Sequence, residues 1–167
     1  FDKISATPSE KISGITGDMI NMETLFAIKE FFEKTIKSKN LDSRSENYYV
    51  NSSNRSNYIF NSKITGIEKT DLIILIGTNP RYEATILNSR IRKAYLNKKI
   101  DIFSIGDVGD LTYPYVALDN TTKIINEIIK NEHKLSNLIN QSQKPMIILG
   151  QSMLKMKSAS FVFEELK

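Results

Sequence analysis

The sequence predicts an α/β fold: a doubly wound, mostly parallel sheet with helices on both faces. Two observations lead to this prediction. A short, unbroken apolar run rich in β-branched residues at Leu72 to Ile76 is typical of a strand buried on both faces, and further strands are predicted at Ile100 to Ile105 and Pro145 to Leu149. Segments whose apolar residues recur at helical spacing separate these predicted strands. Strands that alternate with helices form a parallel sheet through right-handed crossovers.

The composition limits the kinds of protein that this chain can be. Its 167 residues suggest one α/β domain or lobe, and because the sequence begins at Phe1 we expect a processed or incomplete part of something longer. There is no cysteine and only one histidine, His133, so disulfides, thiolate metal sites and the usual iron–sulfur ligands are excluded here. No apolar run approaches the ~20 residues that span a bilayer. The net charge of +4 is spread along the chain and favours a solvated surface over a nucleic-acid footprint.

The first third of the chain predicts one short strand and one helix. Phe1 to Glu10 is expected to be irregular, Ile12 to Thr16 suits a short strand, and Gly17-Asp18 suits a turn. Asn21 is a good N-cap for a helix over Met22 to Lys37. The buried stripe of that helix would contain Leu25, Ile28, Phe32 and Ile36.

Residues 38–57 are predicted to be a long exposed connection, because they are rich in Asn, Ser and charge and have almost no apolar period. Tyr48 and Tyr49, with Arg44 and Arg55, leave two interpretations. Aromatic and arginine side chains together can bind single-stranded nucleic acid, whereas a loop fastened to the surface by its tyrosines explains the same residues. Ile64 to Lys69 is expected to be a short helix before the next strand.

The centre of the chain reads as a strand, a capped turn and a helix. After the strand Leu72 to Ile76, Gly77 permits a tight exit, Asn79 is a good N-cap, and Pro80 fits the first helical position. The apolar stripe of the following helix would contain Ala84, Leu87, Ile91 and Ala94. A helix N-terminus at the carboxyl end of a strand favours anions, and Arg81 adds charge there. The alternative is a turn that only joins two elements.

The last third continues the alternation. Leu111 to Leu118 is predicted to be an irregular apolar piece, and Gln151 to Lys167 a final helix. Two further helices are expected at Thr121 to Lys130 and His133 to Asn140. The plausible core of the final helix would be Met153, Met156, Phe161 and Leu166.

Signatures of catalysis are absent from the sequence. There is no G-x-G-x-x-G fingerprint, no phosphate loop and no G-x-S-x-G nucleophile elbow. Asp107 and Asp110 follow a strand end, where catalytic carboxylates often lie, but a turn rich in Gly and Asp explains them equally well. His133 reads as a surface residue. We therefore expect no catalytic residue and no metal ligand in this chain.

The central residues resemble a known family. Gly77-Thr78-Asn79-Pro80-Arg81-Tyr82-Glu83-Ala84, followed by Asn88 and Arg90-Ile91-Arg92-Lys93, is similar to the largest iron–sulfur subunit of respiratory complex I, NADH:ubiquinone oxidoreductase. Arg55-Ser56-Asn57-Tyr58, Asp110-Leu111-Thr112-Tyr113 and Lys144-Pro145-Met146 match on either side, so the likeness covers roughly 13–151. The Gly-x-Asn-Pro core also occurs in molybdopterin oxidoreductases. One departure is Thr85, where the resemblance leads us to expect proline.

The resemblance implies properties that composition cannot show. The subunit has an amino-terminal part that holds iron–sulfur clusters, and a larger carboxyl-terminal part that resembles molybdopterin enzymes but has generally lost the cofactor. This chain looks like a piece of the second part. Gly77, Thr78, Asn79, Pro80 and Arg81 would then be a vestigial cofactor-site turn that binds no cofactor, with the iron–sulfur clusters located elsewhere in the subunit or complex.

The same resemblance suggests partners and a location. The partners would be other subunits of complex I, including the iron–sulfur-bearing remainder of the same subunit, with no nucleic acid and no direct membrane span. Arg90, Arg92 and Lys93 could dock neighbouring subunits by charge, or they could simply face solvent. The location would be the matrix side of the mitochondrial inner membrane, or the cytoplasmic side of a bacterial inner membrane.

Three functions follow from these expectations. The first is a non-catalytic structural module of the peripheral arm of complex I, supporting electron transfer from NADH to ubiquinone. The alternative is the cofactor-binding domain of a molybdopterin-dependent oxidoreductase, against which stand the absence of cysteine and the short length. The third is a binding module that uses the Tyr- and Arg-containing connection to hold single-stranded RNA.

Overall fold

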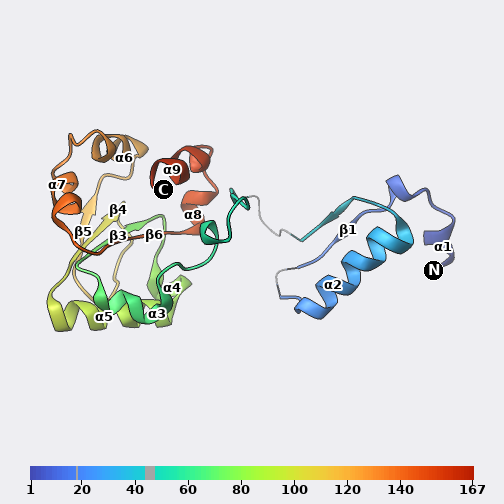
Figure 1. Cartoon of the computed structure of the whole chain (residues 1–167), viewed down its shortest axis with the longest axis horizontal. Helices are drawn as coiled ribbons and strands as arrows, with labels where there is room; N and C mark the ends of the chain where they lie inside the picture. The colour runs from blue at the N-terminus through green and yellow to red at the C-terminus, as the bar shows by residue number, and fades with distance from the viewer. Residues whose placement is uncertain (18, 44–47) are drawn as a thin grey trace. The chain divides into compact units, whose positions relative to one another are not determined.

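The computed structural model describes residues 1–17, 19–43 and 48–167 of the chain. Asp18, predicted to lie in a turn, and residues 44–47, which include Arg44 of the predicted connection, lie outside the described residues. The chain divides into two compact units, residues 1–47 and residues 48–167 (Figure 1). The sequence alone suggests a single domain or lobe over the same length.

The unit 1–47 contains a parallel strand pair joined by a helix. β1 (Gly14–Ile15) pairs in parallel with β2 (Leu41–Asp42). Between them, α2 (Met22–Glu30) continues as a π-helix over Phe31–Ile36. Asn21 caps α2 as predicted, because its side chain accepts a hydrogen bond from the Thr24 N–H at 2.8 Å. Of the predicted stripe, Phe32 and Ile36 are buried, and Leu25 and Ile28 are half-buried.

The start of the chain differs from the prediction. Residues 1–10 were expected to be irregular, but α1 (Asp2–Ser5) and a 3₁₀ turn at Ser9–Lys11 occur there. A single turn needs no apolar stripe, since it is closed by local bonds such as that from the Ala6 N–H to the Asp2 carbonyl at 3.0 Å. Periodicity cannot detect an element of this length.

The unit 48–167 is a four-stranded parallel sheet between two helix layers. The strand order is β5-β4-β3-β6, and every pair is parallel. In Figure 1, α3 and α5 lie on one face of the sheet and α6, α7 and α9 on the other, so the predicted fold class is confirmed. The elements are α3 (Lys63–Gly66), β3 (Leu72–Ile76), α4 (Pro80–Glu83), α5 (Thr85–Lys98), β4 (Asp101–Ile105), β5 (Val116–Leu118), α6 (Thr122–Ile129), α7 (Lys134–Gln141), β6 (Pro145–Leu149), α8 (Gln151–Leu154) and α9 (Ala159–Glu165).

The core of this unit has two halves, one on each face of the sheet. All five residues of β3 are buried, and they alternate between the halves. Ile73 and Leu75 pack with Ile91 and Ala94 of α5. The other face of the strand packs against apolar residues of α6, α7 and α9, among them Ile125, Leu135 and Val162. Because β3 is central and buried on both faces, the turn that follows it begins at the core of the unit.

Two predicted segments of this unit are wrong in detail. Leu111 to Leu118 was expected to be irregular, but its end forms β5, which pairs with β4; three residues are too few to show a strand period. The predicted helix from Gln151 to Lys167 is two helices, α8 and α9, separated by residues 155–158. The break changes the helical register, so Met156 and Phe161 are exposed rather than part of the core.

Residues 48–62, which we call the strap, run from the start of this unit to α3. The Tyr49 N–H donates to the Leu154 carbonyl at 2.8 Å, and the Tyr49 ring packs edge-on against Phe163 of α9 with centroids 5.8 Å apart. The Tyr49 hydroxyl and the Asn51 amide both donate to a Glu164 carboxylate oxygen, at 3.2 and 2.7 Å. Most of the described residues of the predicted connection 38–57 are exposed, with Ser38 as a buried exception.

Candidate functional site: the turn after β3

The turn after β3 has the predicted cap but not the predicted helix. Asn79 caps α4, since its side-chain oxygen accepts from the Arg81 N–H at 3.0 Å, and Pro80 occupies the first helical position. The helix ends after one turn at Ala84, whose φ of −152° and ψ of 70° are not helical. α5 begins anew at Thr85, so Ala84 does not belong to the apolar stripe as predicted, while Ile91 and Ala94 do.

The turn lies at the topological switch point of the sheet. β4 and β5 lie on one side of β3, and β6 lies on the other. In open α/β sheets, ligands bind at this point, in a crevice outside the carboxyl ends of the two central strands. Here those ends are the residues that follow Ile76 and Leu149.

Two glycines close this crevice by bringing the backbones of the two turns together. Gly77 has a φ of +59°, and a Cβ placed on it would lie 2.6 Å from the Cβ of Met153. A Cβ on Gly150 would lie 2.2 Å from the Gly77 carbonyl oxygen. The Gly150 N–H donates to the Ile76 carbonyl at 2.8 Å, and the Ser152 hydroxyl donates to the Gly77 carbonyl. Each position therefore requires glycine, and the space between the turns is filled by protein.

The donors that would serve an anion are occupied by the side chain of Glu83. Its two carboxylate oxygens accept hydrogen bonds from the Thr78 hydroxyl and from the Asn79 N–H, each at 2.9 Å. This carboxylate holds the position at the start of a helix where a phosphate oxygen would otherwise bind. The Glu83 carboxylate is therefore an anion already bound at this turn.

The other polar groups of the turn bind the loop after β4. The Arg81 guanidinium pairs with the Asp110 carboxylate and also donates to the Asp110 carbonyl at 3.2 Å. The Asn79 amide donates to the Val108 carbonyl at 2.6 Å. The pKa of Asp110 is lowered, chiefly by the hydrogen bond from the Thr112 N–H and then by Arg81. The turn and the loop are joined by their own side chains.

Asp107 also has a structural role in this loop. It accepts hydrogen bonds from the Tyr115 hydroxyl at 2.6 Å and from the Gly109 N–H at 2.8 Å. These bonds lower the pKa of Asp107, with that from Tyr115 as the larger cause. Both carboxylates are therefore held in the ionised form by bonds within the loop, an environment unlike that of a general acid, whose pKa is raised.

Comparison with known proteins identifies the family. A family model described as molybdopterin oxidoreductase matches residues 1–167. The chain belongs to the molybdopterin oxidoreductase family. It is 33% identical over 171 residues to the NADH-ubiquinone oxidoreductase 75 kDa subunit of Reclinomonas americana, covering 95% of this chain and 25% of that protein. It is 37% identical over 150 residues to an NADH-quinone oxidoreductase subunit of Rickettsia prowazekii (strain Madrid E), covering 90% of this chain and 22% of that protein.

A third similar protein is the corresponding NADH-quinone oxidoreductase subunit of Rickettsia typhi (strain ATCC VR-144 / Wilmington), at 37% identity over 150 residues, covering 90% of this chain and 22% of that protein. The chain thus spans about a quarter of the length of these relatives. These matches confirm the family resemblance that the motif between Gly77 and Lys93 led us to expect.

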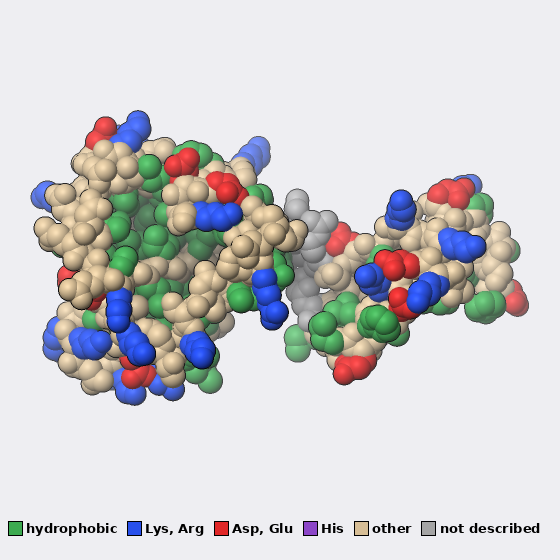
Figure 2. Space-filling view, viewed as in Figure 1, with side chains coloured by type: hydrophobic (Ala, Val, Ile, Leu, Met, Phe, Trp, Pro, Cys, Tyr) green, Lys and Arg blue, Asp and Glu red, His purple; other side chains and the backbone are tan. Residues whose placement is uncertain are grey.

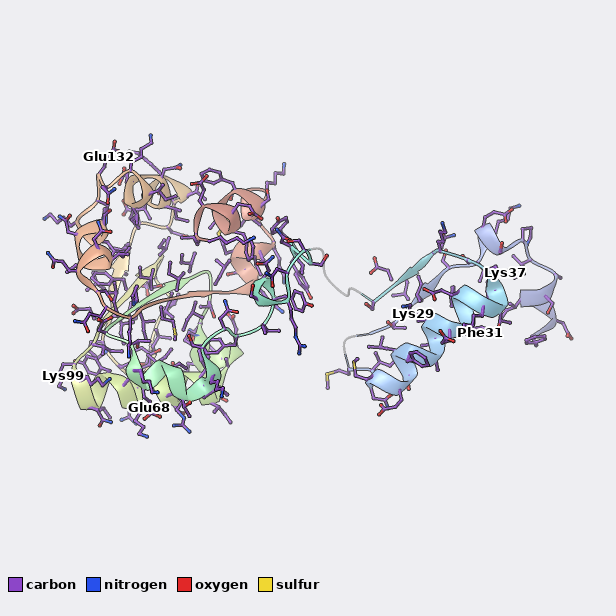
Figure 3. All side chains as sticks on the ribbon, viewed as in Figure 1. Lys29, Phe31, Lys37, Glu68, Lys99 and Glu132 are labelled. Carbon is purple, nitrogen blue, oxygen red and sulfur yellow. The ribbon has the colours of Figure 1, made fainter. Side chains whose placement is uncertain are left out.

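This member of the family places its predicted interface residues on α5. Glu68 lies beside that helix (Figure 3), where its carboxylate pairs with Arg90 and accepts from the Lys93 ammonium at 2.8 Å. The hydrogen bond from Lys93, followed by that from Arg90, lowers the pKa of Glu68. Arg92 is exposed and makes no ion pair with any other residue of the described ranges. Two of the three residues therefore already have a partner within the unit.

Sequence reasoning missed the partners of the turn rather than the turn itself. Glu83 follows the capping residue Asn79 at four residues, whereas the usual capping box has its acidic residue three positions after the cap. Widening that pattern by one residue would have found it. Asp110 lies 29 residues after Arg81, and no local signal connects the two.

No group of three or more His, Cys, Asp or Glu side chains in ranges 1–17, 19–43 and 48–167 is arranged to hold a metal ion. Within the same ranges, no helix is long and apolar enough to cross a membrane.

Proposed function

We propose that this chain is a non-catalytic structural module of the peripheral arm of complex I, where it supports electron transfer from NADH to ubiquinone by iron–sulfur clusters outside these residues. The observation that carries the proposal is the closed switch point. The glycines Gly77 and Gly150 bring two turns into contact, and Glu83 occupies the donors of the first turn. A turn whose polar groups are satisfied by its own side chains supports a structural role for these residues.

The residues of this turn do not suit a molybdopterin cofactor, whose phosphate needs free donors and whose metal needs ligands. The Thr78 hydroxyl and the Asn79 N–H already bind Glu83, and Arg81 already binds Asp110. A bound phosphate would have to displace the Glu83 carboxylate and tolerate its charge nearby. We therefore propose that the chain binds no cofactor itself.

The proposed partners are the other subunits of complex I and the iron–sulfur-bearing remainder of the subunit to which this chain corresponds. The lengths of the relatives support this, because the chain matches about a quarter of each. The proposed location is the matrix side of the mitochondrial inner membrane or, in a bacterium, the cytoplasmic side of the inner membrane. The exposed cation of Arg92 is the interface candidate that the structure leaves available.

The test is native gel electrophoresis of detergent-solubilised membranes, stained for NADH dehydrogenase activity and probed with an antibody against this chain. We expect the antibody signal to comigrate with a large NADH-oxidising band. A second lane, in which high salt strips peripheral proteins before solubilisation, serves as the control for loose adhesion. Migration of the chain as a small species away from the stained band would contradict the proposal.

A second candidate is a cofactor-binding domain of a molybdopterin-dependent oxidoreductase, favoured by the family match over the whole chain. Elemental analysis of the protein purified from its source separates the two functions. Molybdenum or tungsten in stoichiometric amount would support the second candidate, and its absence from a preparation that comigrates with the NADH-oxidising band supports the first.

Nucleic-acid binding through the strap is not proposed. Tyr49 packs against Phe163 and donates to Glu164, so its ring is not presented as a stacking platform. The acidic Glu164 would also repel a phosphate backbone.

A further inference from the structure

The strand β6 is an edge strand with the sequence of a central one. It lies at the end of the order β5-β4-β3-β6, so within the described ranges 1–17, 19–43 and 48–167 only its β3 side is paired. Pro145 to Leu149 is wholly apolar, which is typical of strands buried on both faces of a parallel sheet. Natural edge strands are usually protected by charges, bulges or a covering segment. β6 contains no charged residue and no bulge. Pro145, at its start, is the one residue of the strand that is typical of a protected edge.

An apolar groove of about 620 Å³ runs beside β6. One wall is the strap, where Tyr58, Ile59 and Phe60 are 57%, 46% and 42% exposed. The other wall includes Phe163 and Leu166 of the C-terminal segment. Figure 2 shows hydrophobic side chains gathered in the middle of this unit, between its two helix layers. Exposed apolar groups of this number in one groove mark a surface that a partner covers.

The backbone of β6 offers hydrogen bonds toward this groove. The Gly150 N–H points to β3, where it donates to the Ile76 carbonyl at 2.8 Å. Because backbone groups alternate in direction along a strand, Met146 and Ile148 also point to β3. The N–H and C=O groups of Ile147 and Leu149 therefore point to the outer side of the sheet. A parallel strand placed beside β6 could form evenly spaced hydrogen bonds with these outward N–H and C=O groups.

The connections of the sheet predict the direction of such a strand. The chain passes from β3 to β4 over one face through α5, and from β5 back to β6 over the other face through α6 and α7. Crossovers in parallel sheets are right-handed, so a connection that leaves β6 over the second face places its strand outside β6 and parallel to it. α9 packs on that second face, and Leu166 and Lys167 line the groove.

We propose that the outer edge of β6 receives a fifth parallel strand, an extended apolar segment from the remainder of the subunit, which lies in the groove between β6 and the strap. The occupant follows from length and direction, because the relatives are about four times as long as this chain and, of the two edge strands β5 and β6, only β6 lies on the side to which a right-handed connection over the second face leads. This inference rests on the proposed function, since it names the contact by which the chain joins the rest of its subunit.

Amide hydrogen exchange on the purified NADH-oxidising complex and on the isolated 167-residue chain tests the proposal. We expect the amides of Ile147 and Leu149 to exchange roughly a hundredfold more slowly in the complex, because strand addition bonds them, while the Ile148 amide is protected in both samples. The Ile148 amide, which faces β3, is the internal control. Equal, rapid exchange of Ile147 and Leu149 in both samples would overturn the inference.

A pair of variants provides the second measurement. Ile147→Pro removes an outward N–H and leaves the bonds to β3, whereas Ile147→Val keeps the N–H and the β-branched shape. We expect only Ile147→Pro to reduce incorporation of the chain into the complex, at least tenfold. The exchange of the unsubstituted protein still decides the question if the proline variant does not fold.

Two other occupants would give different results. A second copy of the chain would protect Ile147 and Leu149 in the isolated protein, in proportion to its concentration, and would appear as a dimer in sedimentation; either result overturns the proposal. A small apolar ligand would leave both amides unprotected in the complex, which also overturns it. If the chain comigrates with the NADH-oxidising band while β6 exchanges freely, the proposed function stands and only this inference fails.

Discussion

Tyr113 and Asn88 connect the loop after β4 to helix α5 through a buried pair of side chains. The Tyr113 hydroxyl donates to the Asn88 side-chain oxygen at 2.8 Å, and the Asn88 amide donates to the Leu111 carbonyl at 3.1 Å. Both side chains are buried, so each bond satisfies a group that would otherwise lack a partner. The loop that Arg81 and Asn79 contact is thereby fixed to the helix that follows the turn.

Tyr113→Phe should destabilise the protein by about 1–2 kcal/mol at neutral pH, because it leaves the Asn88 oxygen buried without a donor. It should also change the dependence of stability on pH. Burial raises the pKa of Tyr113 above its ordinary value near 10, so above that pH the unfolded chain loses a proton that the folded chain keeps. The stability contribution is complete below pH ~10 and is lost as the pH rises further.

Urea unfolding between pH 7 and pH 11 measures both effects. The slope of the unfolding free energy above pH ~10 should be shallower in Tyr113→Phe than in the natural protein. Tyr58→Phe, at an exposed tyrosine, is the matched control and should stay within ~0.5 kcal/mol at neutral pH. An unchanged alkaline slope in Tyr113→Phe would show that this hydroxyl is not buried in solution.

At the scale of single residues, what could be predicted depended on how far the partner lies along the chain. Asn79 was predicted as a cap because it bonds a residue two positions away. Arg81 was expected to add charge at an anion site and Asn88 was quoted only as part of a motif, because their actual partners lie 29 and 25 residues away. The contact from Ser152 to Gly77 spans 75 residues and depends on how β3 and β6 pair. Local patterns carry no information on such pairs.

At the scale of elements, the break between α4 and α5 explains why proline is expected at residue 85, the one departure from the family motif. Thr85 is the first residue of α5, the helical position that proline favours. Ala84 already has a non-helical backbone, with φ −152° and ψ 70°, and the residue before a proline is restricted to conformations outside the α region. The expectation of proline at residue 85 therefore has a physical basis in this structure.

Thr85→Pro should stabilise the protein by about 0.4–1 kcal/mol, because it restricts the unfolded chain at a position whose folded conformation suits proline. Thermal unfolding followed by circular dichroism measures the change. Ser89→Pro, four residues further into α5, is the control and should cost about 3 kcal/mol or more, since it lies inside the helix. Destabilisation by Thr85→Pro would show that α4 and α5 are continuous in solution.

The strands and helices were predictable where their apolar pattern was long enough. β3 and β6 are apolar runs of five residues and β4 also has five residues, three of them apolar, whereas β5 has three residues and is too short to show a period. The helix predicted after β6 failed because residues 155–158 interrupt it without a Gly or Pro to mark the break. Pairing with β4 stabilises β5, and that contact is not visible in its own residues.

At the scale of the whole molecule, the two units differ greatly in their buried apolar groups. Among the described residues of 1–47, the buried hydrophobic side chains are Phe32 and Ile36. The unit 48–167 contains both halves of the core around β3. A segment below ~50 residues with so little burial rarely offsets its own conformational entropy. The stability of the chain should therefore reside in residues 48–167.

A chain shortened to residues 48–167 should keep its fold and its unfolding free energy to within about 1 kcal/mol, because deletion of 1–47 removes none of the core around β3. Urea unfolding of the shortened and full-length chains, followed by tyrosine fluorescence, measures the difference. Residues 1–47 expressed alone should show weak helical circular dichroism and no cooperative transition, since α2 lacks a core to pack on. A loss of several kcal/mol in the shortened chain would mean that residues 1–47 stabilise the sheet directly, which the division into two compact units does not predict.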